Sequence, residues 1–334
     1  MQKEKKIKWA ILGAGKIAHK FAQDFSATSN GEIVAVASRD ITKGRAFADQ
    51  YNIPQVLTYN DLYNNGNIDV VYIATPHNFH YSQSLSCLNN GKSVLCEKPV
   101  TINDTELNHL VSVAREKKLF FMEALWTYFL PSIIKAREWL KAGKIGNLKL
   151  IQADFAFAME FNPEGRLFNP LLAGGALLDL GVYLVAFSTY FLGRRPEAIK
   201  ALGHLGRTNI DESVSMIFQS ADVICSLTAS IVTRGTNKGF LFGTNGYIVC
   251  PDFYKTFSAE LYSGDHQLVE SFKDDRSTWG YNYQIQHVTD CLLNGILESN
   301  IVSHSKSLEI QEIMTLVRRQ IGLVYPMEAV SQEK

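Results

Sequence analysis

The sequence predicts an α/β protein of two domains. The first is built on a doubly wound parallel sheet, and the second is an α+β domain with a large, mostly antiparallel open sheet. In the first third of the chain, short apolar strands alternate with helical stretches, which is typical of a parallel sheet. Further on, long strands follow one another with few helices between them. A chain of 334 residues is long enough for both, and the expected domains are 1–124 and 125–334.

Composition and charge argue against several classes of protein. Apolar residues make up 46% of the chain, charged residues 20%, and the formal net charge is zero. Apart from the lysines at 3–8 there is no basic run, and no apolar stretch has the length of a membrane span, so we expect neither nucleic acid nor a membrane as a partner. The five cysteines are scattered and form no Cys-x-x-Cys pair, which predicts free thiols in a cytoplasmic protein and no metal site.

A glycine-rich turn follows the first predicted strand, at 7–12. It has the pattern G-x-G-x-x-A and leads into a helix that ends near Phe25. A strand before and a helix after this pattern are typical of a dinucleotide-binding Rossmann domain, in which a pyrophosphate lies at the helix N-terminus. The alternative is an ordinary strand–helix turn of another α/β protein. The predicted phosphate-binding residues are Gly13, Gly15, Lys16, Ile17 and Ala18.

The second strand, at 32–37, ends in Ser38, Arg39 and Asp40. In this fold the second strand ends near the adenosine ribose. A hydroxyl and a guanidinium suit a 2′-phosphate, and Asp40 is placed to cap the next helix. We therefore expect NADP as the preferred cofactor, with NAD as the alternative. If Arg39 is only a solvated surface residue, this preference loses its basis.

The strand at 69–74 ends in a polar cluster, and so does the strand at 93–96. Because ligands bind at the carboxyl ends of parallel strands, both clusters are expected to line the cofactor site. Lys98 lies at the end of a buried strand, so its ammonium needs a partner, unless the side chain simply reaches solvent. The His-x-x-His spacing is a poor argument for a metal. The predicted site residues are Thr75, Pro76, His77, Asn78, His80, Glu97 and Lys98.

Together these motifs resemble the Gfo/Idh/MocA oxidoreductase family, in the branch of glucose-fructose oxidoreductase, dimeric dihydrodiol dehydrogenase and NADP-dependent xylose dehydrogenase. The matching pieces are the glycine-rich turn, the segment from Ala74 to His80 and Glu97-Lys98-Pro99. The resemblance implies an NAD(P)-dependent oxidoreductase that pairs with further copies through its C-terminal sheet, as a dimer or a tetramer. The Lys98–Pro99 bond is often cis in relatives.

In the second half, Gly174-Gly175 precedes a helical stretch in which Asp179 and Tyr183 share one face. The family pattern here is an Asp followed four residues later by His or, in the dihydrodiol branch, by Tyr. The resemblance implies that Tyr183 is the general acid/base, with Lys98 as its electrostatic partner, and that Asp179 orients the substrate or Lys98. The alternative for Tyr183 is an aromatic ring packed between helix and sheet. Arg166 is a loop arginine, for which a solvated position is the simpler interpretation.

The function expected from these residues is hydride transfer between NADP and a carbon that bears a hydroxyl or carbonyl group in a sugar, polyol or vicinal diol. Two alternatives use the same scaffold. One is a non-catalytic NAD(P)-binding sensor, and the other is a biliverdin-reductase-like enzyme with a planar aromatic substrate. The presence of both Lys98 and Tyr183 favours an enzyme over a sensor, because a binding role does not need an acid/base pair.

Overall fold

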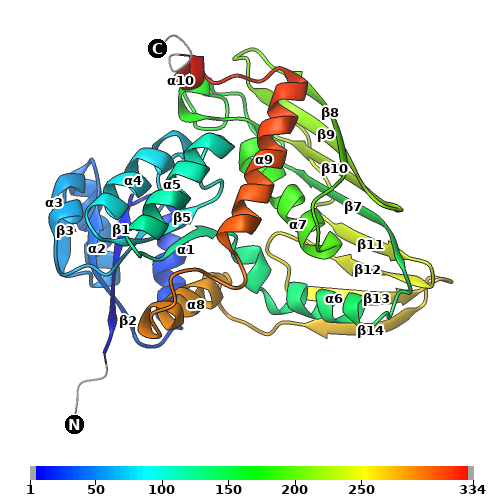
Figure 1. Cartoon of the computed structure of the whole chain (residues 1–334), viewed down its shortest axis with the longest axis horizontal. Coiled ribbons are helices and arrows are strands. Elements are labelled where there is room, and N and C mark those ends of the chain that lie inside the picture. The colour runs from blue at the N-terminus through cyan, green and yellow to red at the C-terminus, as the bar shows by residue number, and fades with distance from the viewer. Residues whose placement is uncertain (1–4, 330–334) are drawn as a thin grey trace. The chain divides into compact units, whose positions relative to one another are not determined.

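The computed structural model describes residues 5–329, so Lys3 of the N-terminal basic run lies outside it. The chain forms two compact units (Figure 1). The first contains the residues up to Trp126 together with Ser277–Leu308. The second contains Thr127–Arg276 and the residues from Glu309 onward. Each unit is described by itself.

The first unit contains a six-stranded sheet in the order β3-β2-β1-β4-β5-β6, and all its pairs are parallel. This is the doubly wound arrangement that the sequence predicted. The strands are short, and the central strands β4 and β5 are apolar runs buried on both faces, as expected for a parallel sheet covered by helices. Their bounds are β1 Ile7–Leu12, β2 Gly31–Ala37, β3 Gln55–Leu57, β4 Val70–Ile73, β5 Ser93–Glu97 and β6 Phe121–Ala124.

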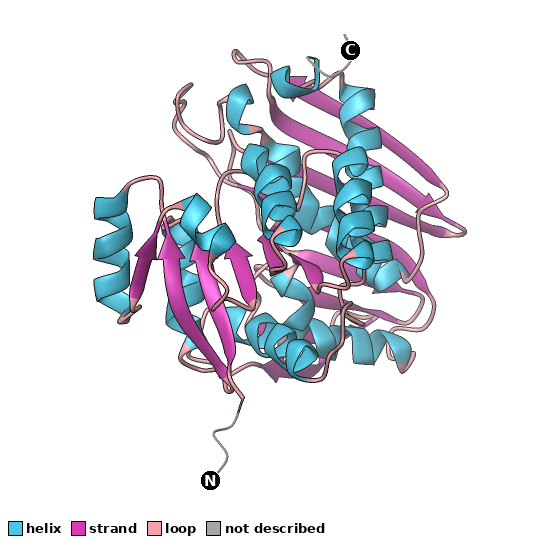
Figure 2. Cartoon of the chain, turned by 60° about the vertical axis from the view of Figure 1, so that its left-hand side comes forward, coloured by secondary structure: helices cyan, strands magenta, loops and turns pink. Residues whose placement is uncertain are grey.

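Helices lie on both faces of this sheet (Figure 2), with α1 beside α8 and α4 beside α5. Helix α9 begins in the first unit and continues into the second. The helices are α1 Lys16–Phe25, α2 Ile41–Tyr51, α3 Tyr59–Asn64, η1 His77–Phe79, α4 His80–Asn89, α5 Asp104–Glu116, η2 Trp126–Phe129, α8 Tyr281–Leu293 and α9 His304–Ile321.

The segment from Ser277 to Leu308 packs with the first unit, whereas the sequence had suggested one continuous second domain from residue 125. The reason is a buried carboxylate on α1. Asp24 accepts hydrogen bonds from the backbone N–H groups of Trp279, Gly280 and Tyr281 at 2.8–3.0 Å. These amides belong to the start of α8. The Asp24 carboxylate on α1 therefore caps the N-terminus of α8, the helix that packs against α1.

The second unit contains an eight-stranded sheet in the order β14-β13-β12-β11-β7-β10-β9-β8. Only the β7–β10 pair is parallel, so the sheet is mostly antiparallel, as predicted. The strands from Gly239 onward were not recognised in the sequence. The bounds are β7 Leu148–Ala156, β8 Ala198–Leu205, β9 Asp211–Ser220, β10 Val223–Ser230, β11 Gly239–Gly243, β12 Gly246–Cys250, β13 Ser258–Ser263 and β14 Leu268–Lys273.

Helices α6 (Pro131–Lys141) and α7 (Val182–Leu192) pack on one face of this sheet (Figure 1). Two short helical turns precede α7, η3 (Pro170–Leu172) and the π-helix η4 (Leu177–Gly181), and α10 (Pro326–Ala329) packs against η3. Pro170–Leu192 is apolar and long enough to cross a membrane, which corrects the expectation that no apolar stretch has this length, but 89% of its apolar window is buried inside the protein. It therefore forms the core of this unit, under the sheet.

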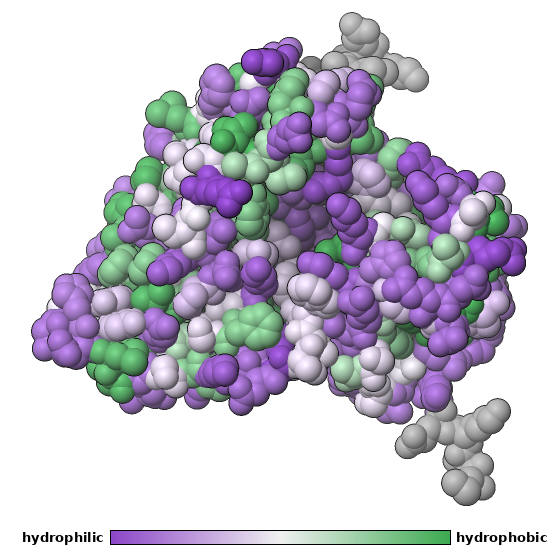
Figure 3. Space-filling view, turned by 180° about the vertical axis from the view of Figure 1, so that it is seen from behind, coloured by the Kyte–Doolittle hydropathy of each residue, from purple (hydrophilic) through white to green (hydrophobic). Residues whose placement is uncertain are grey.

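The face of the molecule drawn in Figure 3 carries mostly hydrophilic side chains, with hydrophobic ones scattered among them. Such mixing is ordinary for a protein surface in contact with water.

Candidate active site

The glycine-rich turn between β1 and α1 can be built only with glycine at its first position. Gly13 has φ +103°. A Cβ there would lie 2.9 Å from Thr75 Cγ2 and 3.0 Å from the Ala74 carbonyl oxygen. The turn therefore lies directly against the end of β4, and both features require glycine.

The N-terminus of α1 is open. Gly15 is its N-cap, and among the described residues no side chain accepts a hydrogen bond at this cap. A Cβ on Gly15 would meet only the Ala74 oxygen, at 3.9 Å, so apart from its chain neighbours this position is not crowded by the rest of the described chain. Gly15 and Lys16 are exposed, whereas Ala18 is fully buried against the sheet. Backbone N–H groups at an open helix start fit the pyrophosphate of a dinucleotide.

The three polar residues at the end of β2 make different contacts, and Asp40 caps the next helix, as the sequence suggested. Asp40 is the N-cap of α2 and accepts a hydrogen bond from the Lys43 N–H at 3.1 Å. Ser38 Oγ accepts from the Asp40 N–H at 3.2 Å. The guanidinium of Arg39 lies 5.4 Å from the centre of the Phe79 ring. The carboxylate is thus engaged in a cap, and a cation stands at the position that faces the ribose in this fold.

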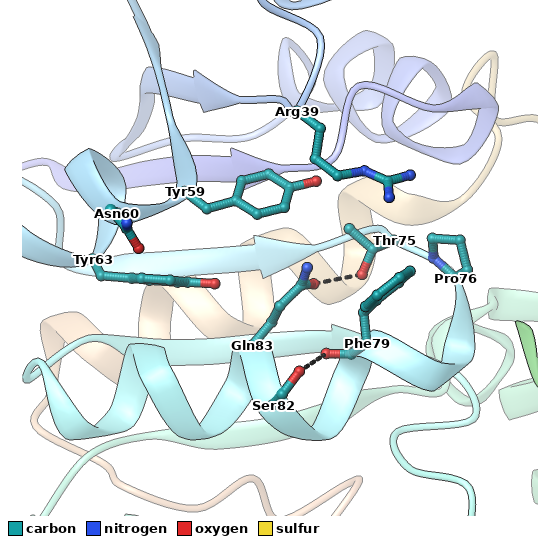
Figure 4. Close-up of a pocket in the computed structure, with 9 residues that line it drawn as sticks. All are labelled: Arg39, Tyr59, Asn60, Tyr63, Thr75, Pro76, Phe79, Ser82 and Gln83. Atoms are coloured by element: carbon teal, nitrogen blue, oxygen red, sulfur yellow. Dashed lines mark hydrogen bonds between the residues drawn. The ribbon is translucent and has the colours of Figure 1, made fainter. Parts of the chain in front are cut away.

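A pocket of about 340 Å³ opens beside Arg39 (Figure 4). Burial raises the pKa of Tyr59 on its wall, while Arg39 acts in the opposite direction through its charge and a hydrogen bond. Sequence reasoning missed the contribution of α3 and α4, because nothing local marks their tyrosine and glutamine side chains as pocket residues. The lining residues are Arg39, Tyr59, Asn60, Tyr63, Thr75, Pro76, Phe79, Ser82 and Gln83.

The predicted residues after β4 divide into two roles. Thr75 and Pro76 line the pocket, and Thr75 Oγ1 donates to Gln83 Oε1 at 2.6 Å. His80 is fully buried, and its two ring nitrogens lie 2.8 Å from the carbonyl oxygens of Thr75 and Pro99. His80 thus ties the turn after β4 to the turn after β5. His77 is buried close to it, with ring centroids 5.7 Å apart, and Asn78 is half-buried.

The end of β5 carries Glu97 and Lys98, followed by a cis bond between Lys98 and Pro99. Glu97 is buried and accepts a hydrogen bond from the Tyr72 hydroxyl. Lys98 is half-buried. A second carboxylate, Glu123 on β6, accepts a hydrogen bond from the Val100 N–H at 3.1 Å.

Nothing in the sequence marks this carboxylate as buried. Burial raises the pKa of Glu123 to about 7, against the opposing effects of the Ser307 hydroxyl, the Val100 amide and the Lys98 ammonium. Its side chain therefore faces the same turn as Lys98.

In the second unit, the chain from Asp179 to Tyr183 begins in a π-helix, whose turns are wider than those of the α-helix that the sequence implied. Leu177–Gly181 is a π-helix, and the regular helix α7 begins only at Val182. The neighbouring leucines 177, 178 and 180 are buried, as expected. Both residues nevertheless act on the guanidinium of Arg166, Asp179 through an ion pair and Tyr183 through its charge.

Arg166 forms a bidentate ion pair with Asp179, with Nη1–Oδ1 3.0 Å and Nη2–Oδ2 3.1 Å. Burial is the largest single effect and acts to lower the pKa of Arg166, but the charge and hydrogen bonding of Asp179 and the charge of Tyr183 together outweigh it and raise that pKa. Arg166 is therefore an exposed loop residue, as the simpler interpretation had it, but its guanidinium is held by an ion pair. A loop arginine carries no local signal of this kind, since its partner is thirteen residues further along the chain.

Aromatic rings surround Tyr183 within the same unit. Phe155 packs edge-on against it at 5.5 Å, and Tyr254 lies 5.9 Å away. Phe157 contacts Tyr254 and is 37% exposed, so one side of this cluster reaches solvent. The cluster offers an apolar wall beside a hydroxyl and an ion pair.

Among the residues that the structure describes, there is no group of three or more His, Cys, Asp or Glu side chains placed to hold a metal ion.

A parallel sheet in this strand order, with a glycine-dependent turn and an open helix N-terminus, defines a dinucleotide-binding oxidoreductase domain. The model of the oxidoreductase family with an NAD-binding Rossmann fold matches residues 7–125, and the GFO/IDH/MocA C-terminal domain matches residues 133–249. The chain belongs to the GFO/IDH/MocA family and is an NAD(P)-dependent oxidoreductase.

Curated relatives cover almost the whole chain. A trans-1,2-dihydrobenzene-1,2-diol dehydrogenase from Xenopus tropicalis is 35% identical over 329 residues, which is 96% of this chain and 99% of that protein. The human protein of the same name is 33% identical, with the same shares covered.

Solved structures share the fold. A 3-ketoreductase from Actinomadura kijaniata, in complex with NADP and TDP-benzene, superimposes with a TM-score of 0.85 at 23% identity, over 95% of this chain and 98% of that one. An aldose-aldose oxidoreductase from Caulobacter crescentus, complexed with glycerol, gives 0.86 at 20% identity, over 95% and 97%.

Proposed function

We propose that this protein is an NADP-preferring dehydrogenase that oxidises a secondary alcohol of a vicinal diol, polyol or sugar, or catalyses the reverse reduction. The observation that carries the proposal is the grouping of Tyr183, Asp179 and Arg166 beside an aromatic wall. The dihydrodiol dehydrogenase relatives support the diol, and the ketoreductase and aldose oxidoreductase structures support a sugar-like alternative.

The first unit fits the cofactor. The open start of α1 suits the pyrophosphate, and Arg39 suits a 2′-phosphate because its neighbour Asp40 is committed to the α2 cap. The pocket beside Arg39, with Tyr59, Pro76 and Phe79 on its walls, suits the adenine. When bound, the nicotinamide accepts the hydride from the alcohol carbon or returns it to the carbonyl.

Tyr183 is the group that takes the hydroxyl proton. A phenol has a reference pKa of about 10, and a neighbouring cation favours the phenolate form. Arg166 supplies one such cation within the second unit. Lys98, on the first unit, is proposed as the second cation and as a hydrogen-bond donor to the reacting oxygen. Asp179 then fixes Arg166 and orients the substrate hydroxyls.

The test is turnover of a panel of vicinal diols, polyols and sugars with NADP and with NAD, for the wild type and for Lys98→Met. We expect NADP-dependent oxidation of at least one diol or sugar, and a loss of turnover of about a hundredfold or more in Lys98→Met with unchanged NADPH affinity. The matched control is Lys117→Met, an exposed lysine at the end of α5. No turnover with the panel despite tight NADPH binding contradicts the proposal.

We also propose that the protein forms homodimers or homotetramers through the face of the eight-stranded sheet that points away from α6 and α7. One row of apolar and aromatic residues crosses five strands there, formed by Ile224, Leu150, Phe242, Tyr247 and Tyr262. Tyr247 and Tyr262 are stacked at 4.9 Å, and Ile224 is 38% exposed. A second copy of the same sheet would bury this row.

Light scattering of the wild type and of Phe242→Arg tests this assembly. A multimer for the wild type and a smaller species for the variant are expected, and a monomeric wild type at micromolar concentration contradicts the assembly.

A cytoplasmic location is the accompanying proposal, supported by five buried free thiols.

A further inference from the structure

The turn Gly174-Gly175, just before the π-helix that carries Asp179, is held from two sides by buried side chains that come from distant parts of the second unit. One is Asp211, at the start of β9, and the other is Tyr325, between α9 and α10. Both are fully buried, with an exposed fraction of 0%. Neither residue has a role in the proposed chemistry, and yet both hold the same turn.

The Asp211 carboxylate reaches both the turn and the helix start. Its Oδ2 accepts a hydrogen bond from the Leu177 N–H at 2.6 Å. Its Oδ1 lies against Gly175, where a Cβ would come within 2.0 Å of it and where φ is +119°. Any side chain at position 175 would therefore displace the carboxylate and release the first amide of the π-helix.

Tyr325 holds the preceding residue. Its hydroxyl donates to the Gly174 carbonyl oxygen at 2.6 Å. A Cβ on Gly174 would lie 2.7 Å from the Arg166 carbonyl oxygen and 2.5 Å from that of Leu167. The same turn is thus packed against the backbone of the loop that delivers the Arg166 guanidinium to Asp179.

Tyr325 is itself fixed by the C-terminal segment. The Arg318 guanidinium lies 5.1 Å from the centre of the Tyr325 ring and forms a bidentate ion pair with Glu328, at 2.7 and 2.8 Å. Glu328 Oε2 also accepts a hydrogen bond from the Tyr325 N–H at 3.2 Å. These contacts leave the Tyr325 hydroxyl one position, which is against Gly174.

We propose that Tyr325 and Asp211 are positioning residues that clamp the Gly174-Gly175 turn and thereby set where Asp179 and Tyr183 stand relative to Arg166. The inference rests on the proposed role of Tyr183. Because reaction rates fall steeply when a catalytic group is displaced by about 1 Å, a loosened turn lowers kcat by up to about a hundredfold. The effect on the KM for the alcohol is smaller, since the apolar wall around Phe155 is not held by this clamp.

The test compares Tyr325→Phe with Thr256→Val. Thr256 is also fully buried in the second unit, and its hydroxyl also donates to a carbonyl oxygen, that of Ser258, at 2.6 Å. Each variant loses a hydrogen bond donated at 2.6 Å, and Thr256→Val also loses the one that Thr256 Oγ1 accepts from the Ser258 N–H at 3.2 Å. Thr256→Val therefore controls for a general loss of stability that is at least as large. We expect kcat to fall about tenfold or more in Tyr325→Phe, with KM within about threefold, and to stay within about twofold in Thr256→Val.

Asp211→Asn is the second variant, and it keeps a carbonyl oxygen for the Leu177 N–H. We expect kcat to fall in it as well, and both clamp variants to keep the wild-type NADPH affinity. The clamp is contradicted if both variants, fully folded by circular dichroism at the assay temperature, turn over within twofold of Thr256→Val. Tyr183→Phe is measured alongside, so that a failure of the proposed function can be told apart from a failure of the clamp. Normal turnover in Tyr183→Phe contradicts the acid/base role of Tyr183, and the clamp then has no catalytic residue to position.

Discussion

Arg166 and Asp179 form a bidentate ion pair in which two guanidinium nitrogens lie 3.0 and 3.1 Å from the two carboxylate oxygens. The Asp179 side chain is 14% exposed and that of Arg166 40%. Paired charges at this partly shielded position hold each other in place, and the charge of Tyr183 acts on the same guanidinium.

Removing the charge of Arg166 should weaken the acid/base group directly. In Arg166→Gln we expect kcat for alcohol oxidation to fall about tenfold or more, and the rising limb on the acid side of its pH profile to move to higher pH. The direction follows because the nearby cation favours the phenolate of Tyr183, so that its loss raises the pKa of that phenol. Arg207→Gln is the control, an exposed arginine whose guanidinium lies over the Phe161 ring. Equal pH profiles for all three proteins would speak against a role for Arg166.

Arg39 should decide the cofactor preference. In Arg39→Ala we expect the Kd for NADPH to rise about 10- to 100-fold, because one or two charge-assisted hydrogen bonds to the 2′-phosphate are lost, while the Kd for NADH changes little. Calorimetric titration of both cofactors measures this. Lys43→Ala, an exposed cation one turn into α2, serves as the control. Equal affinity of the wild type for both cofactors would contradict the proposed role of Arg39 in binding the 2′-phosphate.

The buried carboxyl of Glu123 should make the stability of the protein depend on pH. Its pKa is raised by burial to about 7, whereas an unfolded Glu titrates at about 4.3. Between these values the folded protein holds a proton that the unfolded chain has released. The free energy of unfolding therefore falls as pH rises through this window, by up to about 1.4 kcal/mol per pH unit.

Urea unfolding at pH 5, 6 and 7 measures this slope. Glu123→Gln should flatten it, since the amide does not titrate in this range and its oxygen can still accept from the Val100 N–H. Asp211, with a pKa also raised by burial to about 7, contributes a slope of the same sign that remains in the variant. Glu116→Gln, on the exposed side of α5, should leave the slope as it is. A Glu123→Gln slope equal to the wild type would mean that Glu123 is ionised in the folded protein throughout.

Much of the fold follows from local patterns. The buried strands around β1, β4 and β5 are short, apolar and bounded by turn residues, and Asp40 acts within a few residues of its own position. Helix–strand alternation then requires a parallel sheet. The strands β11 and β12 escaped recognition because each has five residues and begins with glycine, so that neither shows a clear alternation.

The remaining features depend on contacts between distant segments. Asp24 on α1 caps a helix more than 250 residues later, and this contact returns α8 to the first unit. Arg166 finds Asp179 across a loop, and Glu123 is held below the turn after β5 by strand pairing. Neither spacing nor composition marks such pairs, because an isolated loop arginine and an acidic strand residue are ordinary on solvated surfaces.

The central claim is that Tyr183 transfers the proton in an NADP-dependent oxidation. The most direct measurement is kcat of Tyr183→Phe with the best diol or sugar substrate, together with the Kd for NADPH. We predict a loss in kcat of about 10²- to 10⁴-fold, because a positioned acid/base is removed, and an unchanged Kd, because the cofactor contacts lie on the first unit. A kcat within about threefold of the wild type would contradict the account.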